Sequence, residues 1–250
     1  MRPADHPAMV GNGNGLYTKK GSEGKFAMNA ELLGLFSGFP TRHFPDAIAQ
    51  VLRENLPRRE SLVFISAWPE DDARNDGDSD GMHAMFAECG MAFADHRVID
   101  RRTSAADAVK MVRAADCIFL MGGDVTQQMA LIRDLGLVPA LLSSCAVILG
   151  VSAGSMNMGR YVAEIWESKT LQKGLGLTDI TVKAHYTQDA WFLPALKELS
   201  MTHPVAAMED ESAIFLKAGA VWKIGKIHWI DKGEIRDAYA SDALDKFMKR

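Results

Sequence analysis

The sequence of 250 residues has few cysteines and no surplus of positive charge. It holds 28 Lys and Arg against 32 Asp and Glu, so its formal net charge is −4. Nucleic acids and anionic membranes attract strongly basic surfaces, so the composition favours neither as a partner. The three cysteines, Cys89, Cys117 and Cys145, are scattered among apolar residues. They are typical of reduced core thiols, because their spacing suits neither a disulfide framework nor a metal site.

The sequence also lacks an uninterrupted hydrophobic run typical of a membrane helix. The longest uncharged stretch, residues 135–154, has enough residues to cross a bilayer, but Pro139, Ser143 and Ser144 interrupt it. A helix end, a loop and a buried strand explain this stretch better. No apolar segment follows the early charges, so no signal peptide is predicted. We expect a cytoplasmic protein that needs no cofactor.

Residues 1–27 are rich in glycine and polar residues, which predicts a flexible N-terminal extension. The whole chain is 48% hydrophobic. Residues 28–250 are therefore numerous and apolar enough to form one domain with a substantial core.

Strand and helix patterns alternate along the first part of this domain. This alternation predicts an α/β fold, a three-layer sandwich in which helices cover both faces of a mostly parallel sheet. The expected strands are residues 31–39, 61–67, 93–99 and 117–121, and the expected helices are residues 44–56, 82–90, 104–115 and 125–135. Further along, residues 180–184 and 205–208 are expected strands, residues 193–199 an expected helix, and residues 213–230 a short antiparallel C-terminal hairpin region.

An acidic stretch, residues 70–81, separates the second expected strand from its helix. Asp76, Asp78 and Asp80 match the opening of a calcium-binding EF loop. The position that requires the calcium-binding glutamate is Ala87, however, and no helix pattern enters the stretch. We therefore predict a solvated acidic loop.

The most informative motif lies in residues 145–158. An apolar run ends at Gly150, and a Gly-x-Ser-x-Gly turn follows with Ser152 at its apex, which is typical of a strand, a nucleophile elbow and a helix. Glycines on both sides of the serine leave room for a sharp turn. Ser152 is then placed for nucleophilic attack, and the backbone N–H of Ala153 can stabilise the resulting oxyanion.

A nucleophilic serine needs a base, and the base needs a carboxylate that orients it. Among the seven histidines, His185 closes an expected strand, where a parallel sheet presents its catalytic loops, and it is the predicted base. The others are expected to have surface or packing roles: His6, His43, His83, His96, His203 and His228.

The acidic run Glu209-Asp-Glu211 follows another short apolar strand and offers the orienting carboxylate. The order along the chain is then serine, histidine, acid. An α/β-hydrolase places the acid before the histidine, and this alternative would use Asp210 with His228. A second oxyanion donor is expected from the double glycine in Met121-Gly-Gly-Asp124, where backbone N–H groups can approach a substrate closely.

Together these motifs resemble peptidase family S51, the dipeptidase E and cyanophycinase family of serine peptidases, which has the fold of class I glutamine amidotransferases. The resemblance spans residues 29–239 and is carried by residues 35–39, 119–124, 150–155, 185–186 and 209–213. It implies catalytic roles for three side chains and binding roles for four loop positions. These are Ser152 as nucleophile, His185 as base, Asp210 as acid with Glu167 as the alternative, Gly123 and Ala153 as oxyanion donors, and Gly122 and Asp124 as substrate contacts.

The sequence departs from the family at two places. Gly-Gly-Asp-Val stands where the family usually has Gly-Gly-Asn-Thr, and residues 187–200 lack the arginine of aspartyl dipeptidases. Lys197 and Arg160 are the alternative cations. The resemblance therefore implies a serine hydrolase of small peptides, monomeric or homodimeric, without a strict preference for Asp.

Two other functions remain open, an esterase or acyltransferase on the same centre and a non-catalytic binding protein with the same fold. An amidotransferase is disfavoured because its elbow nucleophile would be cysteine, and Cys145 is expected too early, inside the strand.

Overall fold

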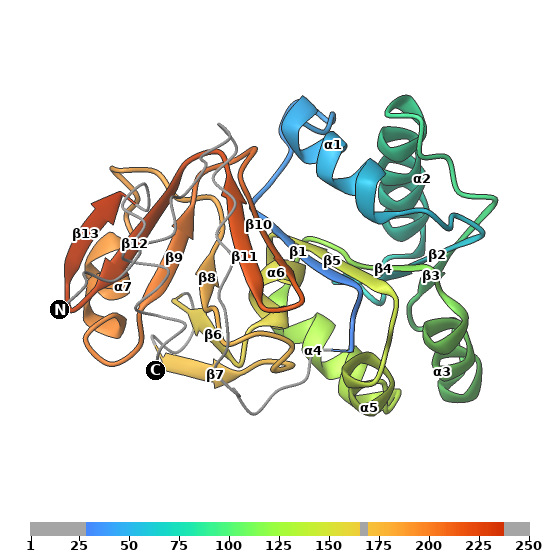
Figure 1. The fold of residues 1–250 in the computed structure, drawn as a ribbon. Helices are drawn as coiled ribbons and strands as arrows, with labels where there is room; N and C mark the ends of the chain where they lie inside the picture. Colours follow the sequence, from blue (N-terminus) through green and yellow to red (C-terminus); the bar gives the residue numbers. More distant parts are fainter. Residues whose placement is uncertain (1–28, 166–169, 238–250) are drawn as a thin grey trace, which may run out of the picture.

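The computed structural model describes residues 29–165 and 170–237, so the predicted N-terminal extension 1–27 and Glu167 lie outside the described residues. Its centre is a seven-stranded sheet with the order β11-β10-β1-β5-β4-β2-β3 (Figure 1). The parallel strands are β1 (Leu32–Phe36), β2 (Ser61–Ile65), β3 (Asp95–Ile99), β4 (Cys117–Leu120) and β5 (Val147–Val151). The antiparallel strands are β10 (Ala213–Lys217) and β11 (Ala220–Ile224).

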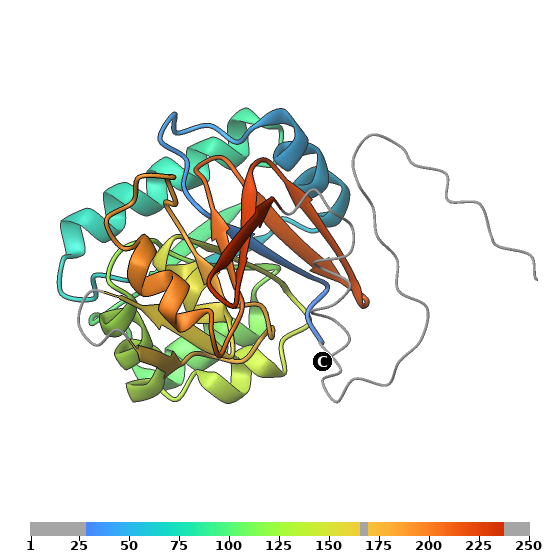
Figure 2. The same ribbon diagram turned by 90° about the vertical axis from the view of Figure 1, so that its left-hand side faces the viewer.

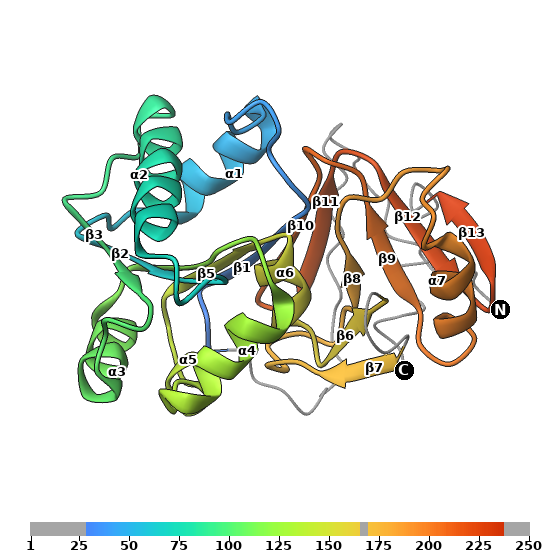
Figure 3. The same cartoon turned by 180° about the vertical axis from the view of Figure 1, so that it is seen from behind.

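Helices cover both faces of this sheet (Figures 1 and 3). One face carries α1 (Asp46–Asn55) and α2 (Asp72–Glu88), and the other carries α3 (Ala105–Ala114), α4 (Val125–Asp134), α5 (Val138–Leu142) and α6 (Ala153–Met158). Alternate residues of the central strands enter the two cores. In β1, for example, Leu33 and Leu35 pack on one face and Leu32 and Phe36 on the other. The predicted three-layer α/β architecture is confirmed.

A smaller sheet lies beyond the β11 edge of the main sheet, at the end opposite β3 (Figures 1 and 2). Its order is β13-β12-β9-β8, and its strands are β8 (Val182–Lys183), β9 (Val205–Met208), β12 (Ile227–Asp231) and β13 (Glu234–Asp237). Tyr186, Phe192 and Leu196 help to form a third core between this sheet and α7 (Leu193–Leu199). A separate hairpin is formed by β6 (Tyr161–Glu164) and β7 (Thr170–Lys173).

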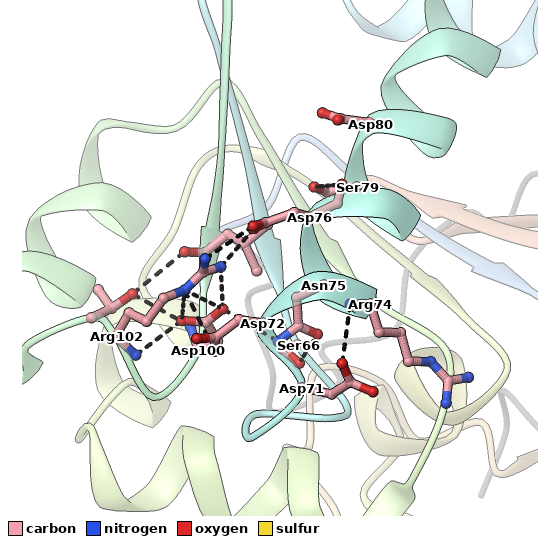
Figure 4. A network of polar contacts seen from close by, with 12 residues as sticks. Ser66, Asp71, Asp72, Arg74, Asn75, Asp76, Ser79, Asp80, Asp100 and Arg102 are labelled. Atoms are coloured by element: carbon pink, nitrogen blue, oxygen red, sulfur yellow. Dashed lines mark hydrogen bonds and ion pairs between the residues drawn. The ribbon is translucent and has the colours of Figure 1, made fainter.

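The prediction of a solvated acidic loop at residues 70–81 is wrong, because most of this stretch is the first half of α2. The carboxylate of Asp71 caps the helix and accepts a hydrogen bond from the backbone N–H of Arg74 at 3.1 Å (Figure 4). Asn75, on the inner side of the helix, is buried and holds the end of β2 through the hydroxyl of Ser66 at 2.6 Å.

Two arginines after β3 neutralise the acidic helix. The guanidinium of Arg102 donates to Asp76 at 2.7 Å and to the fully buried Asp100 at 2.6 Å (Figure 4), and Arg101 pairs with Asp72 at 2.9 Å. Hydrogen bonds from these arginines lower the pKa of Asp72 and of Asp76 below their ordinary values. Acidic residues that favoured a loop prediction are therefore neutralised by arginines that lie next to them in the folded protein.

The uncharged stretch 135–154 folds as α5, a turn and β5, and no helix among the described residues is long and apolar enough to cross a membrane. The cysteines differ from one another. Cys117 is buried, and burial raises the pKa of its thiol well above the ordinary value. Cys89 is half-buried. Cys145 is exposed, so the prediction that it is a core thiol is wrong. It also precedes β5, so the prediction that it lies inside the strand is wrong.

Candidate active site

Ser152 lies at the sharp turn between β5 and α6, as the motif predicts. Its backbone has φ 52° and ψ −115°, a region that non-glycine residues rarely adopt and that costs on the order of 1–3 kcal/mol. Hydrogen bonds hold this conformation. The Ser152 N–H donates to the carbonyl of Phe36 in β1 at 2.9 Å, and the Ser152 carbonyl accepts the N–H of Met156 at 3.0 Å. The serine is thereby fixed between the central strand and the helix.

Gly154 allows the helix after this turn to pack against the sheet. A Cβ at this position would overlap the carbonyl oxygen of Leu120 at the end of β4, so only glycine permits the approach. Every residue of α6 is buried, between the main sheet on one side and β6 and β8 on the other. The position of Ser152 is therefore set by packing on all sides of α6.

The structure brings Ser152, His185 and Asp210 together. The Nε2 atom of His185 lies 2.8 Å from the Ser152 hydroxyl, and its Nδ1 atom lies 2.7 Å from a carboxylate oxygen of Asp210. With the proton on Nδ1, the ring donates to Asp210 and accepts the serine hydroxyl proton. His185 follows β8 and Asp210 follows β9, so the smaller sheet supplies the imidazole and the carboxylate. This arrangement can accept a proton from the serine hydroxyl.

The histidine and its carboxylate face solvent. The His185 side chain is 53% exposed and that of Asp210 is 39% exposed, so a small molecule can reach the serine from this side. His185 itself has φ 56°, and Glu211 beside Asp210 has φ 61°. With Ser152, three non-glycine residues of left-handed conformation thus gather at one place, which is typical of functional sites.

His228 is engaged elsewhere. Its Nε2 atom lies 2.8 Å from a carboxylate oxygen of Glu209, its side chain is only 10% exposed, and its ring lies against that of Tyr186. Asp210, which the α/β-hydrolase alternative assigns to His228, contacts His185 instead. The contact between His228 and Asp210 that this alternative requires is therefore not present. Glu167, the alternative acid, lies outside the described residues.

The double glycine after β4 borders the serine. A Cβ at Gly122 would lie 3.4 Å from the Cβ of Ser152, so this turn packs directly against the turn at Ser152. In the described part of the chain, the N–H of Gly123 makes no backbone–backbone hydrogen bond, and Ala153 is the first residue of α6, so its N–H has no acceptor within the helix. Both are available as donors. Asp124, in contrast, caps α4 by accepting the backbone N–H of Gln127 at 2.8 Å.

Ser152 and His185 open into a pocket of about 490 Å³. Its walls are Trp68, Gly123 to Thr126, Ser152, Ala153, Met156 and Lys183 to His185. Lys183 is only 6% exposed, and its ammonium lies 4.9 Å from the ring centroid of Phe192. Neither Lys197 nor Arg160 lines this pocket, and Arg160 pairs with Asp179 at 2.8 Å. Among the described residues, Lys183 is the one Lys or Arg that lines this pocket, and a single lysine in a short strand gives no signal of such a position in the sequence.

Sequence reasoning also missed Ser37, which follows β1 and is fully buried. Its hydroxyl accepts the backbone N–H of His185 at 2.8 Å and lies 3.0 Å from the carbonyl of Met208 and 3.2 Å from Asp210. One side chain of the main sheet thus fixes both loops of the smaller sheet that meet at Ser152. The signal for it is a polar residue directly after an apolar strand, but the predicted strand runs to residue 39, whereas β1 ends at Phe36.

Gly38 leaves the space in which the imidazole and carboxylate meet. A Cβ at this position would lie 2.5 Å from a carboxylate oxygen of Asp210 and 2.6 Å from the Cε1 atom of His185. The backbone of Gly38 is tied to the same loop, because its carbonyl accepts the N–H of Glu211 at 2.8 Å. Glycine at this position is therefore required by the close approach of the two side chains. Among the described residues, no cluster of His, Cys, Asp and Glu is arranged to hold a metal ion.

Comparison with known proteins identifies related sequences and folds. The family model described as peptidase family S51 matches residues 40–224. The crystal structure of a peptidase from an acI-B1 Actinobacterium has a TM-score of 0.64 and 17% sequence identity, over 84% of this chain and 94% of that chain. A candidate peptidase E protein from Listeria monocytogenes EGD-e has a TM-score of 0.60 and 16% identity, over 78% of this chain and 98% of that chain. No curated protein sequence matches the chain.

We predict that replacing Ser37 by Ala loosens the pairing of His185 with Asp210. The substitution leaves the His185 N–H buried without its acceptor, which should lower the free energy of unfolding by about 1–3 kcal/mol. The hydrogen-bonded Nδ1 proton of His185, observed by NMR, should broaden or disappear because the ring is no longer held.

Ser200→Ala is the matched control. Ser200 is also buried, accepts a backbone N–H from Gly233 at 2.9 Å and donates to the carbonyl of Lys197 at 2.7 Å. It should lose similar stability and keep the Nδ1 signal. Equal loss of the signal in both variants would contradict a positioning role for Ser37.

Proposed function

The chain belongs to peptidase family S51, and on this premise we propose that it cleaves the amide bonds of small peptides through an acyl-enzyme on Ser152. The observation that carries the proposal is that His185 contacts Ser152 at 2.8 Å and Asp210 at 2.7 Å. A serine hydroxyl is a weak nucleophile until a base takes its proton. His185 is placed to take it.

In the first half of the reaction, the Ser152 oxygen attacks the carbonyl carbon of the scissile bond while its proton moves to Nε2 of His185. Asp210 accepts the hydrogen bond from Nδ1–H and stabilises the imidazolium that forms. The carbonyl oxygen becomes an oxyanion, and the N–H groups of Gly123 and Ala153 are the donors assigned to it. The intermediate collapses when Nε2–H protonates the amine, which leaves with the second half of the peptide.

The second half returns the enzyme to its starting state. A water molecule attacks the ester between the acyl group and Ser152, and His185 takes one of its protons. The tetrahedral intermediate collapses, the proton returns to the Ser152 oxygen, and the carboxylic acid is released. Exposure of the His185 side chain supports this step, because water reaches the imidazole from solvent.

Asp210 is the acid assigned here, with Glu167 as the alternative. The 2.7 Å contact with Nδ1 of His185 favours Asp210, because the orienting carboxylate must contact the nitrogen that the serine does not use.

We further propose that the enzyme has no strict preference for an N-terminal Asp. Binding a side-chain carboxylate in a partly desolvated pocket favours a bidentate guanidinium, and no arginine of the described residues lines the pocket beside Ser152. Lys183 lines the pocket, but its ammonium lies over the ring of Phe192, which is not part of the lining. The carboxylate of Asp124, which lines the same pocket, caps α4, and a negative charge at this place disfavours a substrate carboxylate.

Replacement of Ser152 tests the proposed nucleophile. Ser152→Ala should lower kcat for dipeptide hydrolysis by about 10⁴-fold or more while the fold persists, because the attacking atom is gone. A serine-directed fluorophosphonate should label Ser152 in the unchanged protein, as read by mass spectrometry. Labelling at another serine, or an unlabelled protein that still binds peptides, would contradict the proposal, and the second result would favour a binding protein.

Two histidine–carboxylate pairs allow a matched test of the base and the acid. His185 with Asp210 and His228 with Glu209 have nearly equal distances, 2.7 and 2.8 Å, but Ser152 contacts only the first pair. We expect His185→Ala and Asp210→Asn to lower kcat by up to about 10⁴-fold. His228→Ala and Glu209→Gln should change kcat less than about tenfold once protein stability is matched.

Larger losses of kcat in His228→Ala and Glu209→Gln than in His185→Ala and Asp210→Asn would contradict this assignment. A large loss in His228→Ala with an active His185→Ala would support the α/β-hydrolase order. Glu167→Gln completes the set, since a larger loss in that variant than in Asp210→Asn would transfer the role of the acid to Glu167.

Substrate preference at the N-terminal residue is tested with Asp-Leu, Ala-Leu and Lys-Leu. Without a charged hydrogen bond worth about 1.5–3 kcal/mol, kcat/KM for Asp-Leu should not exceed that for Ala-Leu by tenfold. Lys183→Met is the informative variant. A tenfold or greater advantage for Asp-Leu that disappears in Lys183→Met would refute the proposal and show that Lys183 binds the carboxylate.

A further inference from the structure

A second pocket adjoins the nucleophile elbow on the other side of the glycine turn. Its volume is about 220 Å³, and Gly122 and Val151 belong to its wall. Because a Cβ at Gly122 would lie 3.4 Å from the Cβ of Ser152, one residue separates this pocket from the serine. The pocket beside His185 has Gly123 in its wall instead. The two pockets therefore flank the place where a scissile bond would lie.

The floor of the second pocket is apolar. Phe64 and Phe119 come from the ends of β2 and β4 and are fully buried, and Met85 and Met121 are 5% and 6% exposed. A cavity lined by aromatic and methionine side chains favours an apolar occupant, since burial removes apolar surface from water.

Two glycines of α2 keep this pocket open. Gly77 and Gly81 are one helical turn apart and line the pocket, and a Cβ at either position would meet no atom within 4 Å. Glycine in the interior of a helix lowers its stability relative to alanine. Larger residues would fit α2 equally well and would stabilise it, but they would narrow the cavity. The two glycines therefore leave the pocket open and lower the stability of α2.

The charged groups at the mouth indicate which half of a peptide enters. Arg42 and Asp78 line the pocket. Asp78 is paired with Arg74 at 3.4 Å, whereas the guanidinium of Arg42 has no ion-pair partner in the described part of the chain. A peptide residue that carries both an apolar side chain and a free carboxylate is the C-terminal one. In a dipeptide this residue lies on the amine side of the scissile bond.

We propose that this pocket binds the apolar side chain of the residue on the amine side of the scissile bond, with Arg42 facing its carboxylate. The proposal rests on the proposed function, because it needs Ser152 as the reacting group to define the two sides. It gives the protein a preference for dipeptides that end in a residue such as Leu.

The test compares Ala-Leu, Leu-Ala and Ala-Ala in the full chain. The unchanged protein should hydrolyse Ala-Leu with a kcat/KM at least about tenfold above that for Ala-Ala, as apolar pockets typically discriminate. Gly81→Leu fills the pocket and should reduce this ratio to about one. The ratio of Leu-Ala to Ala-Ala should stay unchanged, because the other side of the bond is not altered.

Ala84→Leu is the matched control, since Ala84 is exposed on the same helix and does not line the pocket. This variant should leave both kcat/KM ratios unchanged, that of Ala-Leu to Ala-Ala and that of Leu-Ala to Ala-Ala. Gly77→Leu serves as a second filling variant should Gly81→Leu not fold. An unchanged preference for Ala-Leu in the folded filling variants would overturn the proposal, and a loss confined to Leu-Ala would place the pocket on the acyl side and also overturn it.

Arg42 is tested with an amidated substrate. Arg42→Gln should lower kcat/KM for Ala-Leu by about two- to fivefold, the range of one exposed ion pair, and should not change it for Ala-Leu amide. An equal change for both substrates would refute the contact with the carboxylate.

Calorimetry separates failure of this inference from failure of the proposed function. Ala-Leu should bind to the Ser152→Ala protein, and the additional Gly81→Leu substitution should weaken this binding about tenfold. If Ser152→Ala still hydrolyses dipeptides, the proposed function has failed, whereas the dependence of binding on Gly81 still supports the pocket. If binding is independent of Gly81, the pocket assignment has failed even where Ser152 is the nucleophile.

Discussion

The close packing of α6 against the ends of β4 and β5 is the constraint on which the rest of the site depends. Gly154 permits contact with the Leu120 carbonyl, and the short helix is then buried on all sides. This packing holds Ser152 in a strained backbone conformation that an isolated turn would not keep. The free energy cost of this strain is smaller than the stabilisation from the apolar burial of α6, so Ser152 keeps its position at the edge of the sheet.

The second requirement is that two sheets meet at one point. The main sheet contributes Ser152, whereas the smaller sheet contributes His185 and Asp210 through the loops after β8 and β9. Ser37 joins them, because its hydroxyl contacts both loops from the end of β1. Buried hydrogen bonds of this kind are directional, so they set the relative position of the sheets more sharply than apolar contact does.

Charge pairing has a comparable role in holding α2. Arg101 and Arg102 neutralise carboxylates of α2 and Asp100, which is fully buried, and this fixes the helix over β2 and β3. The helix thereby forms one wall of the apolar pocket beside Gly122. A stretch whose composition suggests only solvent contact therefore helps to shape a candidate binding site.

The sequence by itself predicted the alternation of strands and helices in the first part of the domain, the turn at Ser152 and the place of His185 after a strand, because each depends on residues close together along the chain. Apolar periodicity and glycine spacing are local properties, and a residue that closes a strand of a parallel sheet is directed to one edge. The pairing of Asp210 with His185, the support from Ser37 and Gly38, and the helical state of residues 72–81 were decided only by the tertiary structure. In each case the partners are far apart in sequence. Asp76 is neutralised by an arginine 26 residues away, and Ser37 contacts a histidine 148 residues away. Contacts over such separations depend on how the sheets pack, which no local pattern records.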